Sequence, residues 1–225
     1  MVVDTLINTL YTDCNRRVAC LMLNNLTKPI ENRQKLAHHN GFIPAILHFI
    51  QANDKDTHIC CLILLNLSHE QYAAFEGVPD FLKTMESLMS IYTPVAFTNN
   101  VKSVESEALK YTLGIMANIA VDKQNATRIC NSSIPKHALT LLQNTPNALR
   151  RWTHNSMEDC CLRLLVRLAH HDMCLYYLSE LDTDGVLYKD LDGKGGIHDM
   201  RARVIKARLD EWRLVGSAVR DNHID

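Results

Sequence analysis

The sequence predicts an all-α protein built as an α-solenoid, in which about four similar groups of helices stack one on another. Segments with apolar residues at helical spacing recur in a fixed order: a short helix, an apolar helix and a longer helix. The clearest group is residues 31–68. Three helices of this length cannot bury their apolar faces alone, so each group needs a neighbour. Only 8 glycines and 6 prolines interrupt the chain, which also favours helices over strands.

The predicted array covers residues 2–196 and begins part-way through a repeat. Its first two helices match the second and third helices of the clearest group, with nothing in front to match the first. Complete groups follow, and the last group departs from the pattern at a glycine-rich stretch. The expected repeats are 2–27 (partial), 31–68, 70–121, 122–170 and 171–196 (irregular).

Prolines and glycines predict where helices begin and turn. Pro44, Pro79 and Pro135 suit the first turn of a helix, where the missing proline N–H has no partner to lose. Gly41 and Gly77 suit left-handed turns between the first and second helices of a group. The sequence therefore predicts a sharp reversal of the chain at each of these glycines.

Breakers and charges predict the loops and the C-terminal end. Pro94 lies in the irregular stretch 93–102, which we interpret as an enlarged loop, and a second enlarged loop follows Asn144. Residues 197–214 form a strongly charged helix, as the polar outer face of a terminal capping helix requires. We expect residues 215–225 to fray.

Two signatures give the chain a resemblance to the armadillo repeat family. The first is Glu31-Asn32-Arg33-Gln34 followed by Gly41-Phe42-Ile43-Pro44, and the second ends the third helices. Its matches are Asn25-Leu26-Thr27, Asn66-Leu67-Ser68, Asn118-Ile119-Ala120 and, less well, Arg167-Leu168-Ala169. The resemblance covers most of residues 2–190 and implies a right-handed superhelix whose third helices line a concave groove.

In such a superhelix Asn25, Asn66 and Asn118 stand in a ladder along the groove, as the resemblance implies. An amide offers both a donor and an acceptor, so it can pair with the backbone of an extended peptide. The alternative is that each asparagine caps its own helix or the adjoining turn. The sequence leaves both roles open.

The groove departs from the nuclear-import type of armadillo protein, which has a tryptophan four residues before the asparagine. Those positions here are Leu21, Leu62 and Gly114. A basic localisation signal is therefore not the expected ligand, and apolar or mixed partners are favoured. Arg163 and Arg167, one turn apart, are predicted to add a basic spot that takes a carboxylate or phosphate. Their alternative is a solvated helix face.

The composition of the chain limits the kinds of partner and the cellular compartment that we expect. The net charge is −1 and charges of both signs are spread along the chain, so nothing indicates a nucleic-acid partner. No apolar run is long enough for a membrane span, and the N-terminus lacks the pattern of a signal peptide. The adjacent pairs Cys60-Cys61 and Cys160-Cys161 within helical patterns favour buried, reduced thiols. We expect a cytoplasmic or nuclear protein.

No catalytic constellation, cofactor site or metal site stands out. His170-His171-Asp172 resembles the His-Asp pair of all-helical metal-dependent phosphohydrolases. A metal site would need further ligands, and the only loose candidates are His154 and an unidentified Asp. Asp190 and Asp192 begin like a calcium loop, yet Lys194 and Arg201 give the wrong charge.

The sequence therefore predicts a non-catalytic module, a scaffold or adaptor that binds an extended peptide or a partner helix in the groove. The phosphohydrolase remains one alternative, and a capping fragment of a larger scaffold is another. Because the first repeat is partial, its exposed apolar surface also predicts self-association.

Overall fold

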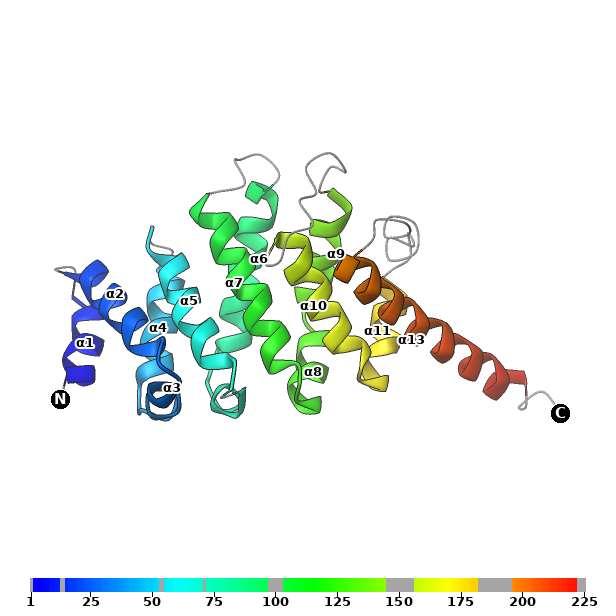
Figure 1. The fold of residues 1–225 in the computed structure, drawn as a ribbon, viewed down its shortest axis with the longest axis horizontal. Coiled ribbons are helices and arrows are strands. Elements are labelled where there is room, and N and C mark those ends of the chain that lie inside the picture. The colour runs from blue at the N-terminus through cyan, green and yellow to red at the C-terminus, as the bar shows by residue number, and fades with distance from the viewer. Residues whose placement is uncertain are drawn as a thin grey trace. The chain divides into compact units, whose positions relative to one another are not determined.

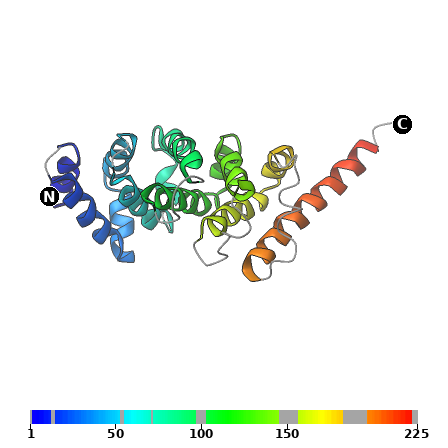
Figure 2. The same ribbon diagram turned by 90° about the horizontal axis from the view of Figure 1, so that it is seen from above.

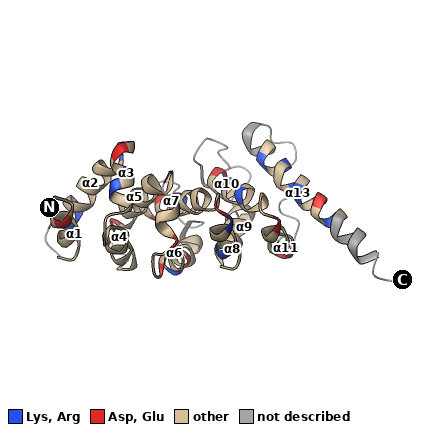
Figure 3. Ribbon diagram, turned by 90° about the horizontal axis from the view of Figure 1, so that it is seen from below, with Lys and Arg blue, Asp and Glu red and all other residues tan. Residues whose placement is uncertain are grey.

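The computed structural model describes residues 2–12, 15–52, 55–70, 72–96, 103–144, 156–181 and 196–221. Every regular element in these ranges is a helix, which confirms the all-α prediction. The chain divides into two compact units, Met1–Ile119 (unit 1) and Ala120–Asp225 (unit 2). Basic and acidic residues are interspersed along the helices of each unit (Figure 3).

Unit 1 contains two layers of helices, with short first helices between successive groups. Its elements are α1 (Val2–Leu10), α2 (Arg16–Thr27), α3 (Ile30–Ala37), α4 (Phe42–Gln51), α5 (Thr57–Ser68), the 3₁₀ turn η1 (Tyr72–Phe75), α6 (Phe81–Ala96) and α7 (Val104–Ile119). The third helices α2, α5 and α7 pack side by side in one layer, and the second helices α4 and α6 form the other (Figures 1 and 2).

Unit 2 repeats the same order of elements. It contains α8 (Lys123–Cys130), α9 (Ile134–Asn144), α10 (Met157–Ala169), α11 (Asp172–Leu181) and α13 (Gly196–Asp221). The third helix here is α10, and α13 packs along it. Ala202, Ile205 and Leu209 of α13 are buried.

Capping and turn chemistry explain several helix starts. Gly41 has φ 80° directly before α4, so the predicted left-handed turn is confirmed there, and Pro44 lies in the first turn of that helix. The Asp122 carboxylate accepts a hydrogen bond from Asn125 N (2.8 Å) at the start of α8. Ser156 Oγ accepts from Asp159 N (3.2 Å) and starts α10 in the same way.

The region before α6 differs from the sequence prediction. Gly77 does not adopt a positive φ, and the left-handed residue is instead Asp80, with φ 57°. Aspartate is one of the few residues besides glycine that tolerates this conformation. Because α6 begins at Phe81, Pro79 precedes the helix rather than lying in its first turn.

Two predicted helix ends were also wrong. The helix α6 runs through Pro94 to Ala96, so residues 93–96 are helical and do not belong to the predicted loop. Proline has no N–H to bond to the carbonyl four residues earlier. Because Pro94 lies in the last turn of α6, the loss of this hydrogen bond affects only the end of the helix. The helix α13 extends to Asp221, past the expected end at Leu214, and the single Gly216 costs only about 1 kcal/mol in a helix interior.

The small residues of the third helices allow close packing between successive groups. Cys20 Sγ of α2 lies 3.7 Å from Cys60 Sγ of α5, and Thr112 Oγ1 of α7 lies 3.9 Å from Cys61 Sγ of α5. All four residues are fully buried or nearly so. The seven cysteines in the described ranges are free thiols, all of them buried.

We predict that the stability of the fold falls at high pH. Burial raises the pKa of the Cys61 thiol from 9.0 to about 12, and partial burial together with Glu107 raises that of Tyr111 from 10.0 to about 12. Because both folded pKa values exceed the unfolded ones, the contribution of these two groups to the free energy of unfolding is complete below about pH 9 and is lost as the pH rises toward about 12. Urea unfolding at about pH 8 and pH 11 measures this loss.

Variants of Cys61 and Tyr111 separate the contributions of the two side chains to this loss of stability. Cys61→Ala should reduce the loss of stability between the two pH values, and Tyr111→Phe should reduce it further. An equal loss in the wild type and the double variant would contradict the assignment to these residues.

We also predict that the contact between α13 and α10 depends on one ion pair. The Asp159 side chain is 1% exposed and forms a salt bridge with Arg201 of α13. Removing the guanidinium by Arg201→Met leaves a buried carboxylate without this partner, so the free energy of unfolding should fall by roughly 3 kcal/mol. Lys136→Met, at an exposed position of α9 in the same unit, is the control and should change it by less than about 0.5 kcal/mol. Equal effects would refute the role of the ion pair.

Candidate peptide-binding face

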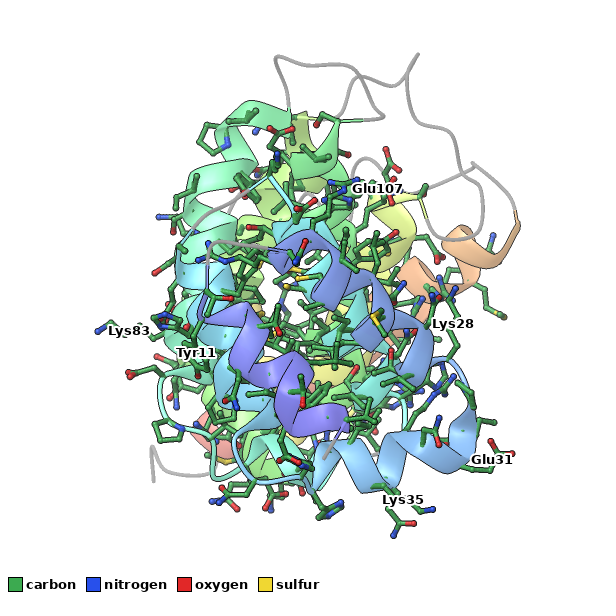
Figure 4. The ribbon with its side chains drawn as sticks, turned by 90° about the vertical axis from the view of Figure 1, so that its left-hand side faces the viewer. Tyr11, Lys28, Glu31, Lys35, Lys83 and Glu107 are labelled. Atoms are coloured by element: carbon green, nitrogen blue, oxygen red, sulfur yellow. The ribbon has the colours of Figure 1, made fainter. Side chains whose placement is uncertain are left out.

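The three asparagines of the predicted ladder stand at the same position of α2, α5 and α7, near the C-terminal end of each helix. Asn25 is exposed, and Asn66 and Asn118 are half-buried. Because these helices lie side by side, the side chains form one row across unit 1, which we call the amide row. In the end view of Figure 4, Lys28 just after α2 and Lys83 of α6 project from opposite sides of the layers.

The half-buried amides are hydrogen-bonded to the preceding third helix. Asn66 Nδ2 donates to Thr27 Oγ1 (3.0 Å) and more weakly to Asn24 Oδ1 (3.4 Å), both on α2. Asn118 Nδ2 donates to Ser68 Oγ (3.0 Å) on α5. The same kind of bond therefore joins α2 to α5 and α5 to α7.

The hydroxyl groups continue this bonding into the backbone. Thr27 Oγ1 donates to the Asn24 carbonyl (2.8 Å), and Ser68 Oγ donates to the Leu65 carbonyl (2.9 Å). Both residues are buried. Each hydroxyl therefore acts as a donor within its own helix and as an acceptor for the next repeat, which orients the amide.

The first asparagine has different surroundings. Asn25 Oδ1 accepts a hydrogen bond from Lys28 Nζ (2.9 Å), three residues later. This contact resembles the local role left open by the sequence, whereas the amides of Asn66 and Asn118 bond to a neighbouring helix. The amide row therefore combines one local contact with two contacts between repeats.

Apolar side chains lie beside the amides at the positions where the nuclear-import proteins carry tryptophan. Leu21 is 42% exposed, Leu62 is half-buried and Gly114 is buried. A Cβ at Gly114 would come within 2.9 Å of Leu65 Cδ1, so Leu65 occupies the space that a larger residue would need. The face is thus apolar and amide-lined.

The opposite end of the same face carries a polar cluster that the sequence reasoning missed. Partial burial by itself would raise the pKa of Glu107, but hydrogen bonds from Lys110 and Tyr111 lower it, with a smaller contribution from His58 of α5. The sequence contains a signal for this cluster, because Lys110 and Tyr111 follow Glu107 by three and four residues and so lie on the same side of a helix. The salt bridge of Glu107 with Lys110 forms in the structure. Glu107 is therefore a negatively charged, partly buried group near the N-terminal end of α7 (Figure 4).

Arg163 and Arg167 lie on α10 of unit 2. They occupy the positions that correspond to Leu62 and Asn66 on α5. Arg163 is half-buried and Arg167 is exposed. By their helical positions, both arginines belong to the face of α10 that corresponds to the amide-lined face of α5.

The described contacts do not favour the phosphohydrolase alternative. His171 Nε2 lies 2.8 Å from the Ala120 carbonyl, and Asp172 Oδ1 forms a salt bridge with Arg208 Nη2 (2.6 Å). His154 and residues 190–195 lie outside the described residues. Within the described ranges, no three His, Cys, Asp or Glu side chains gather closely enough to hold a metal ion, and no helix is long and apolar enough to cross a membrane.

Comparison with known proteins supports the fold. No family model and no curated protein matches the chain. A crystal structure of an engineered protein has a TM-score of 0.72 at 17% identity, covering 93% of this chain and 79% of its own. A second engineered protein has a TM-score of 0.73 at 17% identity, covering 92% and 47%. A designed armadillo repeat protein in complex with the peptide (KR)4 has a TM-score of 0.69 at 13% identity, covering 98% and 92%.

These similarities and the stacked third helices define the class of the protein. The chain is an all-α solenoid with an armadillo-like repeat fold. The resemblance read from the sequence is therefore confirmed at the level of fold.

We predict that the hydroxyl groups under the amide row stabilise unit 1. Thr27→Val and Ser68→Ala each remove the acceptor of one inter-repeat hydrogen bond and should lower the free energy of unfolding by about 1 kcal/mol. Thr140→Val is the control, because its hydroxyl donates within α9 to the Lys136 carbonyl. Urea denaturation of the three variants measures the difference. If Thr140→Val is as destabilising as the other two, the inter-repeat bonds contribute nothing particular.

Proposed function

We propose that the chain is a non-catalytic protein-binding module whose amide-lined face in unit 1 holds an extended peptide segment. The observation that carries the proposal is the row of Asn25, Asn66 and Asn118 across three packed helices. A row of amides can bond to a peptide backbone whatever its sequence, while apolar neighbours select side chains.

The hydrogen bonds of the row favour one polarity of contact. The amide nitrogen of Asn66 and of Asn118 already donates to the preceding helix. The carbonyl oxygen Oδ1 is the natural remaining group for an incoming ligand, so these residues would accept hydrogen bonds from peptide N–H groups. Packed helices lie about 8–10 Å apart, which corresponds to two or three residues of an extended chain.

The neighbouring side chains support an apolar or mixed ligand. Leu21, Leu62 and Leu65 offer apolar contacts next to the amides. Arg163 and Arg167 on α10 are a separate part of the proposal, as a place for a carboxylate or phosphate of the partner. A reducing compartment, the cytoplasm or nucleus, fits the buried free thiols and belongs to the same proposal.

We predict that removing two amides weakens peptide binding. Peptides would be selected with the whole chain from a phage-displayed library of random linear peptides, and their affinity measured by fluorescence anisotropy. The double variant Asn66→Ala, Asn118→Ala should weaken binding by more than about tenfold, because two backbone contacts are lost.

The matched control keeps the amides and removes their internal partners. Thr27→Val with Ser68→Ala breaks the same inter-repeat hydrogen bonds but retains both Oδ1 acceptors. Its affinity should stay within about threefold of the wild type. The proposed function would be refuted if the library yields no binder. It would also be refuted if a selected peptide has the same affinity for the wild type and for both double variants.

A further inference from the structure

The C-terminal helix α13 has the buried residues of a third helix. Counted from the asparagine of α5 and α7, and from Arg167 on α10, the residues six and three positions earlier and one position later are buried. They are Cys60, Ile63 and Leu67 on α5, Thr112, Ile115 and Ile119 on α7, and Cys161, Leu164 and Leu168 on α10. The buried Ala202, Ile205 and Leu209 of α13 have the same spacing. This match puts Arg208 in the place of the asparagine.

The hydrogen bonds of Arg208 support this alignment independently. In unit 1 the asparagine of one third helix bonds to the residue two positions after the asparagine of the preceding third helix. These bonds run from Asn66 to Thr27 and from Asn118 to Ser68. Arg208 Nε donates to the carbonyl oxygen of Ala169 (3.3 Å), which is two positions after Arg167 on α10. Arg208 therefore contacts α10 at the place where an asparagine would.

The direction of α13 also agrees with that of a third helix. The salt bridge of Arg201 with Asp159 joins the N-terminal parts of α13 and α10, and the bond of Arg208 to Ala169 joins residues further along both helices. The two helices therefore run parallel, as neighbouring third helices do in unit 1. In unit 2 the helix α13 thus has the place of the third helix after α10.

Three arginines on these two helices occupy the face that carries amides in unit 1. Arg167 of α10 and Arg208 of α13 are at the asparagine position, and Arg163 lies one turn before Arg167. We call these three residues the arginine row. Arg167 is exposed, and Arg163 and Arg208 are half-buried.

The surface charge of α10 is basic because its acidic residues are buried. The charged residues of this helix are Glu158, Asp159, Arg163 and Arg167. Glu158 is 4% exposed and Asp159 is 0% exposed, and Asp159 is paired with Arg201. The arginines alone therefore bring charge to the surface of α10.

Arg208 already binds carboxylates of its own chain. Its Nη2 lies 2.6 Å from Asp172 Oδ1, and its Nη1 lies 2.7 Å from Glu211 Oε2. The side chains of Asp172 and Glu211 are 84% and 64% exposed. Ion pairs with carboxylates this exposed contribute little free energy, so an anionic group of a ligand can replace them.

We propose that the arginine row binds an anionic segment of a partner peptide, with carboxylate or phosphate groups on an extended chain. Guanidinium groups form paired, charge-assisted hydrogen bonds with both kinds of anion. Packed helices lie about 8–10 Å apart, so anionic residues two or three positions apart would reach Arg167 and Arg208. The inference rests on the proposed function, because it takes the third helices as the peptide-binding face, and it adds selection by charge in unit 2.

Fluorescence anisotropy of the whole chain with three defined peptides tests the charge selection. The peptides have about twelve residues and differ only at every second position, which is glutamate, phosphoserine or glutamine. The glutamate or the phosphoserine peptide should bind at least about tenfold more tightly than the glutamine peptide, and which of them binds identifies the source of the anion. Raising the salt from about 50 to about 300 mM should weaken this binding. Equal affinity for all three peptides, or no binding of any, would overturn the proposal.

Charge-removing variants locate the site. Arg167→Gln should weaken binding of the preferred anionic peptide by more than about fivefold, because it removes a charge-assisted contact. Lys136→Gln is the matched control, since it removes the same charge from an exposed position of the second helix α9, and it should change the affinity by less than about twofold. Equal losses in the two variants would mean attraction by net charge alone and would overturn the arginine row.

The variant Glu211→Gln tests the part of Arg208. Because it removes a carboxylate that competes for the guanidinium, the affinity for the anionic peptide should rise by more than about twofold. Glu180→Gln, at an exposed position of α11, changes the net charge equally and should have a smaller effect. Packing of Arg208 against α10 alone would give no such gain, so equal effects of the two variants would remove Arg208 from the row.

These measurements separate this inference from the proposed function. Library peptides that lose affinity in the double variant Asn66→Ala, Asn118→Ala but not in Arg167→Gln, without any preference for the anionic peptides, would overturn the arginine row alone. Binding of an anionic peptide that depends on Arg167, together with a library that yields no binder sensitive to the asparagine variant, would support the row and contradict the role of the amides. Circular dichroism of each variant checks that the helices are intact.

Discussion

The structure of unit 1 depends on one contact, the packing of each third helix against the next. No group of three short helices can bury its apolar faces alone, so the stability of each repeat is shared with its neighbours. Cys20, Cys60, Cys61 and Thr112 keep this contact close because their side chains are small. The distance between neighbouring third helices in turn sets the spacing of the asparagines along the amide-lined face.

The asparagines serve the stability of the fold as well as the proposed binding of a peptide. The amide nitrogens of Asn66 and Asn118 hold neighbouring helices in register through Thr27 and Ser68. The carbonyl end of each amide is thereby oriented on the face that we propose binds a peptide. A residue type that looks like a ligand contact in the sequence is thus also part of the fold.

Local sequence chemistry predicted some turns correctly and failed at others. Gly41 and Pro44 combine a residue that tolerates positive φ with one suited to a helix start, and the structure confirms both. The similar pair Gly77 and Pro79 does not behave in this way, because the left-handed residue is Asp80. Phe81, which follows Asp80 and begins α6, is buried, and a local preference such as that of glycine is weak enough for tertiary packing to override it.

The sequence by itself determined the fold class, the order of helices in each repeat and the positions of the asparagines, because these follow from helical periodicity and from short motifs. Only the tertiary structure decided what each side chain contacts. Equivalent residues such as Met22 and Ile63 have the same place in the motif, yet one is exposed and the other buried. Burial depends on the neighbouring helix, and a local pattern contains no information about that neighbour.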